Sequence, residues 1–345
     1  MSEAKEIDPA EFYETFHAVR REVRKVVAGQ EGVVEHLLAS VFADGHVLLK
    51  GPPGLGRTLM VRTLAHVLGL EFRRIQFSPD LLPTDILGAE VLESNVSTGE
   101  RKFRFFKGPV FANLILADEV NRSPTRTQAA LLEVMQERQV TSVGHTYFLP
   151  KPFILIATQN TLETEGVWTL SEAQTDRFLM MIEQDYPQED EERRMLRLTT
   201  GSGRLMPECV TDAETIQAMQ RLAREVPVVP SVKDFALSIV RSSRPGESEA
   251  VEASRHDVRL GASPRAAQAL LLSAKVLALA RGRRHVTRQD VIGVTKPVMA
   301  HRLLMDVRAH AEGRGHQQVI DALIQQAKQK SLAETSKWTR ELLKI

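Results

Sequence analysis

The sequence predicts an α/β protein in which helices cover both faces of a parallel sheet, followed by a unit made of helices. Short apolar runs at 46–50, 114–117 and 153–157 alternate with helical patterns, which is typical of buried parallel strands. Beyond residue 186 the helical pattern takes over, and the chain becomes rich in Ala, Leu, Arg and Glu. At 345 residues the chain is long for one domain. We therefore divide it into an α/β core, residues 1–186, and a helical unit, residues 187–345.

The core is expected to begin with a helix. Asp8 can cap this helix and Pro9 suits its first turn. The apolar residues that follow recur at helical spacing and predict a face packed on the core: Phe12, Phe16, Val19, Val23 and Val26. The pattern ends at residues 27–30.

Two hairpins are expected to interrupt the alternation of strands and helices, at residues 91–106 and 140–149. The first shows two strands around Thr98-Gly99, and its second arm alternates polar and aromatic residues. In the other, strands at 140–143 and 146–149 flank Gly144-His145, a turn with Gly first. The sequence leaves open whether these strands pack as edges of the fold or are exposed for a functional contact.

The helical unit is expected to contain no strands after Pro187. Residues 244–257 are polar, contain Pro245-Gly246 and are predicted to form a mobile loop. Ser263 caps a helix that runs to residue 280, and Thr287 opens another helix through a capping box.

A glycine-rich loop follows the first strand and opens a helix, with the sequence Gly51-Pro52-Pro53-Gly54-Leu55-Gly56-Arg57-Thr58. The strand–loop–helix setting is that of a phosphate-binding P-loop, whose backbone N–H groups and helix N-terminus attract phosphate. The threonine hydroxyl is placed to ligate Mg²⁺. The predicted nucleotide-binding residues here are Pro53, Gly54, Leu55, Gly56, Arg57, Thr58 and Leu59.

One residue of this loop departs from the P-loop pattern, which calls for lysine where Arg57 stands. Lysine is a compact point charge, whereas arginine is a larger planar fork with a different reach. Phosphate binding can survive this change while the transition state is stabilised less well. The rate of hydrolysis is therefore open.

An apolar strand at 114–117 ends in Asp118-Glu119, about sixty residues after the P-loop. This arrangement matches the Walker B pattern, in which the first acid holds Mg²⁺ and the second orients and deprotonates the attacking water. Phosphoryl transfer needs little beyond such positioning and charge neutralisation. We therefore predict Asp118 as a metal and nucleotide ligand, together with Thr58, and Glu119 as the catalytic base.

Several segments resemble the MoxR family of AAA+ ATPases, and the similarity spans roughly residues 25–305. Thr161 stands where the family usually has Pro, and Arg57 stands where it has Lys. The resembling segments are residues 26–30, 75–86, 107–113, 117–122, 157–160 and 261–265.

The resemblance implies roles for residues outside the loop. Asn160, at the end of the third strand, would be the sensor between the two acids and the γ-phosphate; the alternative is a turn-forming Asn. Val27 and Ala28 would lie against adenine.

Two arginines resemble residues that complete a neighbour's site or report on it. Arg177 lies in a segment like the one that carries the arginine finger, which would reach the γ-phosphate bound by the adjacent subunit. The alternative is an ion pair with Asp176 or Glu172. Arg265, in the first turn of a helix of the second unit, resembles sensor 2 and would couple the nucleotide state to the domain angle.

The family further implies ATP/ADP and Mg²⁺ as cofactors, a hexameric ring, and chaperone-like remodelling or activation of an unidentified client. A partner carrying a von Willebrand factor A domain is also implied. Two alternatives are a nucleotide-binding scaffold with little turnover, favoured by Arg57, and a nucleic-acid motor. The net charge of +1 and the local nature of the basic clusters at 20–25 and 281–284 argue against the motor.

The chain is expected to lie in the cytoplasm. Its single cysteine, Cys209, allows no intramolecular disulfide. No apolar run approaches the roughly 20 residues needed to span a bilayer, and the polar, acidic start is unlike a secretion signal.

Overall fold

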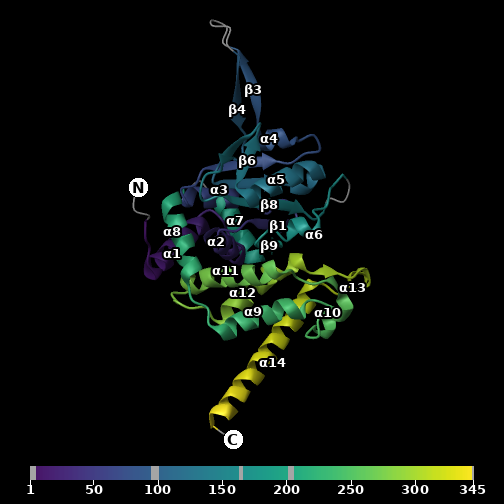
Figure 1. Ribbon diagram of the computed structural model, residues 1–345. Coiled ribbons are helices and arrows are strands. Elements are labelled where there is room, and N and C mark those ends of the chain that lie inside the picture. Colours follow the sequence, from purple (N-terminus) through teal and green to yellow (C-terminus); the bar gives the residue numbers. More distant parts are fainter. Residues whose placement is uncertain (1–4, 95–100, 163–165, 201–205, 344–345) are drawn as a thin grey trace.

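A five-stranded parallel sheet forms the centre of the computed structural model, which describes residues 5–94, 101–162, 166–200 and 206–343 (Figure 1). The strand order is β2-β5-β8-β1-β9, and each pair of neighbours is parallel. The parallel sheet predicted from the sequence is therefore confirmed. Its strands are β1 (Val47–Gly51), β2 (Phe72–Gln76), β5 (Leu114–Asp118), β8 (Ile154–Asn160) and β9 (Met180–Glu183).

The helices of the first half begin where their capping residues predict. Asp8 accepts hydrogen bonds from the backbone N–H groups of Ala10 and Glu11, which fixes the start of the first helix. Its apolar stripe is buried, and this helix packs against both α3 and α11. The helices are α1 (Pro9–Arg24), α2 (Glu31–Phe42), α3 (Arg57–Val67), α4 (Pro83–Leu87), η1 (Val120–Arg122), α5 (Thr125–Glu137) and α6 (Glu172–Thr175).

Both predicted hairpins are present: β3 (Gly88–Ser94) with β4 (Arg101–Lys107), and β6 (Gln139–Ser142) with β7 (His145–Phe148). Thr98-Gly99 lies outside the described residues. The turn predicted at Gly144-His145 is wrong by one residue. Val143 and Gly144 form it, with φ of 42° and 79°, because the tightest hairpin turns need positive φ at both central positions.

The second half is mainly helical, as expected, but it contains a small antiparallel sheet of β10 (Val258–Leu260) and β11 (Leu304–Met305). The prediction that strands end at Pro187 is therefore wrong, since two- and three-residue strands leave no periodic pattern. The other elements are α7 (Glu189–Thr200), α8 (Ala213–Glu225), α9 (Pro230–Ser242), α10 (Glu252–Asp257), α11 (Pro264–Ala280), α12 (Arg288–Met299), η2 (Ala300–Arg302), α13 (Val307–Ala311) and α14 (His316–Leu343).

The predicted loop at 244–257 is only partly a loop, because its second half forms α10. Ser254 and Asp257 of that helix are buried, and Asp257 accepts a hydrogen bond from Arg314 at 2.9 Å. The polar composition predicts a solvated segment, whereas part of it is buried, with the Asp257 carboxylate paired with a charged arginine inside the fold. The starts predicted at Ser263 and Thr287 are confirmed.

Figure 1 shows the hairpin β3–β4 running away from the sheet at one end of the molecule and α14 projecting at the other. Helices α11 and α12 lie beside β9 and α2, so the helical half packs on the edge of the sheet that ends in β9. Within the described ranges, none of the helices combines the length and apolar character needed to cross a bilayer.

Candidate functional site

A cavity of about 520 Å³ opens at the carboxyl ends of the sheet strands β1, β5 and β8. Ligands of open α/β sheets bind at this edge. The cavity brings together most residues predicted from the sequence and adds Arg62 and Thr158. It is lined by Pro53, Gly54, Leu55, Gly56, Arg57, Thr58, Leu59, Arg62, Asp118, Glu119, Thr158 and Asn160.

The loop between β1 and α3 wraps one side of this cavity. Gly54 and Gly56 have φ of 86° and 71°, a region that side chains with a Cβ rarely adopt. Gly56 is also the N-cap residue of α3, and no side chain caps the first turn. The orphan N–H groups of that turn, with the positive end of the helix dipole, therefore face the cavity without a side-chain acceptor.

The side chain of Arg57 is engaged by three protein acceptors. Its Nε donates to Oε1 of Gln184 at 2.6 Å, and its Nη2 donates to the carbonyl of Pro52 at 3.1 Å. Its Nη1 reaches the carbonyl of Gln159 at 3.5 Å. Burial lowers the pKa of Arg57 from its usual value, and the charges of Asp118 and Glu119 oppose this shift. The side chain of Arg57 is thus held by these three acceptors and is not free in the cavity.

Asp118 is held by donors on both of its oxygens. Thr158 donates to Oδ1 at 2.7 Å, and Nε and Nη2 of Arg74 donate to Oδ2 at 2.9 and 2.6 Å. Arg74 projects from the neighbouring edge strand β2, whose Gln76 is in register with Asp118. A charged fork of this kind is a strong hydrogen-bond donor to a carboxylate. The carboxylate is therefore oriented and neutralised by a residue the sequence did not single out.

Glu119 has a left-handed backbone, with φ of 58° and ψ of 50°, which is uncommon for a residue with a side chain. Its N–H donates to Oγ1 of Thr158 at 2.8 Å. Its Oε2 accepts from Nε2 of Gln76 at 2.9 Å and from Nη1 of Arg122 at 3.1 Å. Backbone strain of this kind is typical of functional sites, where surrounding contacts hold it.

Asn160 ends β8 and is buried at the cavity wall. Its Oδ1 accepts from the N–H of Leu162 at 3.1 Å, which is the turn-forming bond of the alternative reading. The side chain therefore makes the turn bond and also lies beside the two acids, so the two interpretations do not exclude each other.

Arg177 and Arg265 are not among the residues that line the cavity within the described part of the chain. Asp176, which precedes Arg177 in the chain, binds Arg265 at 3.4 Å and Arg302 at 2.9 Å. The alternative of an ion pair between Arg177 and Asp176 or Glu172 is not found among the described residues, and Asp176 binds other arginines. Arg177 is exposed and donates from Nη1 to the carbonyl of Leu132 at 3.3 Å.

Arg302 fastens η2 to the segment before β9. It donates to the carbonyls of Asp176, Phe178 and Leu179 as well as to the Asp176 carboxylate. Burial lowers its pKa to about 10, while Asp176 opposes the shift, so the guanidinium stays charged at neutral pH. Arg302 therefore fixes the segment of residues 176–179, which contains Arg177 and the partner of Arg265.

Val27 and Ala28 also lie outside the cavity lining. Their segment is nevertheless joined to the loop, because Nε2 of Gln184 donates to Oε1 of Gln30 at 2.7 Å and Oε1 of Gln184 accepts from Arg57. Gln184 directly follows β9 and leads toward α7. It thus links the phosphate loop, the segment before α2 and the connection to the helical half.

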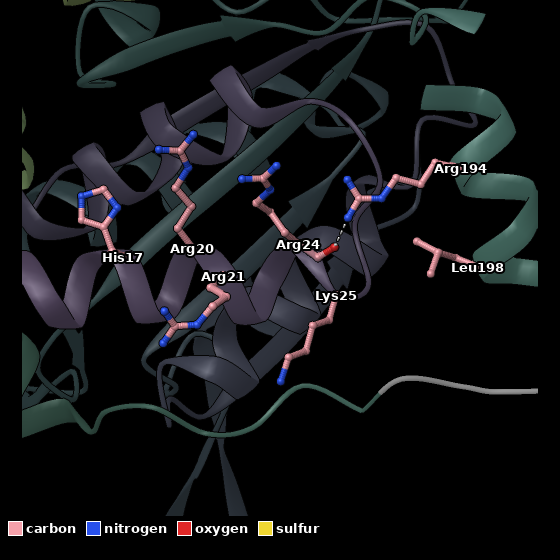
Figure 2. Close-up of a pocket in the computed structure, with 7 residues that line it drawn as sticks. All are labelled: His17, Arg20, Arg21, Arg24, Lys25, Arg194 and Leu198. Atoms are coloured by element: carbon pink, nitrogen blue, oxygen red, sulfur yellow. Dashed lines mark hydrogen bonds between the residues drawn. The ribbon is translucent and has the colours of Figure 1, made fainter. Parts of the chain in front are cut away.

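A second cavity, of about 550 Å³, lies between α1 and α7 and is lined by the basic cluster of residues 20–25 (Figure 2). Arg20 and Arg24 pair with Glu31, and Arg194 donates to the carbonyl of Arg24 at 3.1 Å. The ion pairs with Glu31 join α1 to α2, and the bond from Arg194 joins α7 to α1.

The other basic cluster is also engaged internally. Arg281 and Arg283 both bind the buried carboxylate of Asp290, at 2.8 and 2.5 Å. Two arginines of each cluster are thus paired with carboxylates, which reduces the positive charge that either cluster offers to a nucleic acid.

Four residues that shape the site were missed: Thr158, Arg74, Gln76 and Gln184. Thr158 carried a signal, because it is a polar residue in the apolar strand next to β5. The strand β2, which holds Arg74 and Gln76, showed no pattern that predicts a strand. It is an edge strand with one buried residue, so it shows no apolar run.

Comparison with known proteins gives consistent results. Residues 46–180 match the family described as "ATPase family associated with various cellular activities (AAA)", and residues 251–323 match "AAA lid domain". Chaperone MoxR1 of Mycobacterium tuberculosis is 40% identical over 304 residues, 88% of this chain and 79% of that one. Protein MoxR of Methylorubrum extorquens is 30% identical over 83% of this chain and 86% of its own.

A solved structure shares the fold. The crystal structure of a candidate ATPase from Cytophaga hutchinsonii superposes with a TM-score of 0.84 at 37% identity, over 92% of this chain and 96% of that chain. The predicted AAA+ fold, with its parallel sheet and helical lid, is thereby confirmed.

Proposed function

Because the chain belongs to the MoxR family of AAA ATPases, we propose that it hydrolyses ATP to remodel or activate a client protein. One observation carries the proposal. The phosphate loop, two carboxylates and a buried asparagine converge on one cavity at the carboxyl edge of the sheet. Steady-state ATP hydrolysis by the purified chain with Mg²⁺, at increasing protein concentration, tests it. A rate that rises more than proportionally supports an assembled enzyme, and no turnover at any concentration contradicts it.

The residues of the cavity fit a nucleotide with Mg²⁺. The uncapped first turn of α3 and the positive-φ glycines form a cradle of N–H groups that suits phosphate oxygens. The hydroxyl of Thr58 and the carboxylate of Asp118 are oxygen donors of the kind that Mg²⁺ prefers, and both line the cavity. When bound, the metal would neutralise charge on the β- and γ-phosphates.

The chemical step needs a base for water and donors for the departing charge. We assign the base to Glu119, whose carboxylate is oriented by Gln76 and Arg122. It would accept a proton from the water that attacks the γ-phosphorus, while ADP leaves with the electron pair of the broken P–O bond. Asn160 would orient the same water, and Arg57 would supply positive charge beneath the loop.

We further propose that the enzyme is a ring, expected to be a hexamer, in which Arg177 completes the site of the adjacent subunit. The exposure of Arg177 and its separation from the cavity of its own chain support this role. Arg265 pairs with Asp176, the residue that precedes Arg177, and we propose that both arginines act in trans. A partner with a von Willebrand factor A domain and the identity of the client remain expectations from the family.

The scaffold alternative, in which nucleotide binds without turnover, is favoured by the contacts of Arg57. Under the ATPase proposal, Arg57→Lys changes the turnover rate by less than about threefold, because lysine keeps the charge in the cavity. Arg57→Ala, which removes the charge, weakens ATP binding at least tenfold or so. The turnover rate and the ATP affinity of the two variants distinguish the ATPase from the scaffold. A gain of more than about tenfold in the lysine variant would favour the scaffold.

The ion pair between Arg74 and Asp118 is expected to compete with the metal. Arg74→Ala should lower the Mg²⁺ concentration for half-maximal nucleotide binding by about two- to fivefold, a modest effect because the pair is partly exposed. Fluorescent nucleotide titrated against Mg²⁺ measures it. Arg73→Ala is the control, since Arg73 pairs with Glu71 at 3.0 Å, away from Asp118. A higher Mg²⁺ requirement in Arg74→Ala would show that Arg74 assists the metal instead.

A further inference from the structure

The two hairpins share one apolar face. Phe105 of β4 stacks on Tyr147 of β7, with ring centroids 4.3 Å apart, and meets Phe111 edge-on at 5.9 Å. Because side chains alternate along a strand, Phe103 lies on the same face as Phe105, and its partner in register is Leu92. We call Leu92, Phe103, Phe105 and Tyr147 the hairpin strip.

The outer half of this strip is open to solvent. Phe103 is 72% exposed and Leu92 is 45% exposed, although both are large apolar residues. The ribbon β3–β4 projects from the sheet, and neither strand pairs with any other in the described part of the chain (Figure 1). A contiguous exposed apolar surface on a two-stranded ribbon is costly unless something covers it.

The charges around the strip define what covers it. Arg101 lies on the same face at the outer end and Lys107 at the inner end, about 20 Å apart along the strand, with Glu90 between them. The Nζ of Lys107 lies 5.1 Å from the centroid of the Phe111 ring. The partner thus has an apolar stretch of about six residues, the span of a strand of that length, with an acidic side chain at each end. We propose that the hairpin strip binds an extended segment of this kind in a polypeptide client.

A second copy of the chain fits this face poorly. If two strips docked antiparallel, Arg101 would meet Lys107, and if they docked parallel each cation would meet its own counterpart. Like charges directly opposed are destabilising in either case. Single-stranded nucleic acid also fits poorly, because Glu90 lies on the same face opposite Phe105, where an evenly charged phosphate chain would pass.

This inference rests on the proposed remodelling function, since it identifies the part of a client that the ATPase holds. The test uses the full chain and a fluorescent peptide of about ten residues, apolar in the middle with glutamate at each end. Fluorescence anisotropy should show binding that Phe103→Ser weakens at least about tenfold. Phe106→Ser is the matched control, because Phe106 lies on the opposite face beneath Arg104, and its affinity should stay within about twofold.

A second peptide with lysine at both ends should bind at least about tenfold more weakly, and Arg101→Ala should reduce that difference. Basal ATP turnover of all three variants should equal that of the parent chain, which also shows that they fold. Equal binding by Phe103→Ser and the parent, or no binding by a parent chain that hydrolyses ATP, would overturn the inference and leave the proposed function standing. So would a preference for single-stranded DNA that Phe103→Ser abolishes. A parent chain that binds the peptide but never hydrolyses ATP would instead refute the proposed function.

Discussion

Replacing Glu119 by glutamine is expected to lower ATP turnover at least a hundredfold or so while ATP binding is retained. The amide keeps the shape of the side chain and its bond to Arg122 is weakened, but it cannot accept the proton of the attacking water. The phosphate cradle of α3 is untouched by this change, so affinity for ATP should stay close to that of the parent. Turnover and nucleotide titration on the same preparation measure both quantities.

Glu71→Gln is the matched control for this prediction. Glu71 precedes β2 at the opposite end of that strand and pairs with Arg73, so its loss should leave turnover unchanged. Unchanged turnover in Glu119→Gln would refute the assignment of the base. Loss of ATP binding in that variant would mean that Glu119 holds nucleotide rather than activating water.

Arg177→Ala is expected to reduce turnover by about a thousandfold, with ATP binding again retained. The reason is that a guanidinium at the γ-phosphate stabilises charge that develops only in the transition state. Within the described ranges Arg177 donates one hydrogen bond, to the carbonyl of Leu132 3.3 Å away, so its removal should cost the fold little. Arg73→Ala, another exposed arginine, serves as the control. A thousandfold loss of ATP affinity, or no effect on turnover, would contradict the role.

The parts of the candidate site that lie in contiguous segments could be predicted from the sequence. A phosphate-binding loop needs its glycines, its helix start and its threonine within eight neighbouring positions, so residues 51–58 were enough to predict one, and the structure places them on the cavity. Asp118 and Glu119 end a fully apolar strand, and that abrupt change of character marks the edge of a sheet. The starts at Asp8 and Ser263 were readable because a cap acts over only a few residues.

Residues brought to the site by strand order could not be predicted. Arg74 reaches Asp118 only because β2 lies next to β5, a pairing across about forty residues that no local pattern encodes. Gln184 meets Arg57 only because β9 is the neighbour of β1. Both side chains look like ordinary polar residues in the sequence, because their roles depend on tertiary packing.

The position of Arg265 is a further case. Its helix start was predicted, but the side to which it points depends on how the helical half meets Asp176. Arg265 is absent from the cavity lining and pairs with Asp176, so the sequence left open whether it acts within its own subunit or on a neighbour, and we propose the second. The hairpins show the converse: their strands were predicted, while the stacking of Phe105 on Tyr147 was not.

A mixture of two inactive variants tests the central claim, that each site is completed by the next subunit, most directly. Glu119→Gln keeps Arg177, and Arg177→Ala keeps Glu119, so a subunit of the second kind next to one of the first has an intact site. If the arginine acts in trans, an equal mixture reassembled from dissociated subunits should recover about a quarter of the parent rate, the fraction of intact neighbouring pairs in a randomly mixed ring. If the mixture stays as inactive as its two components, Arg177 does not complete a neighbour's site and the account is wrong.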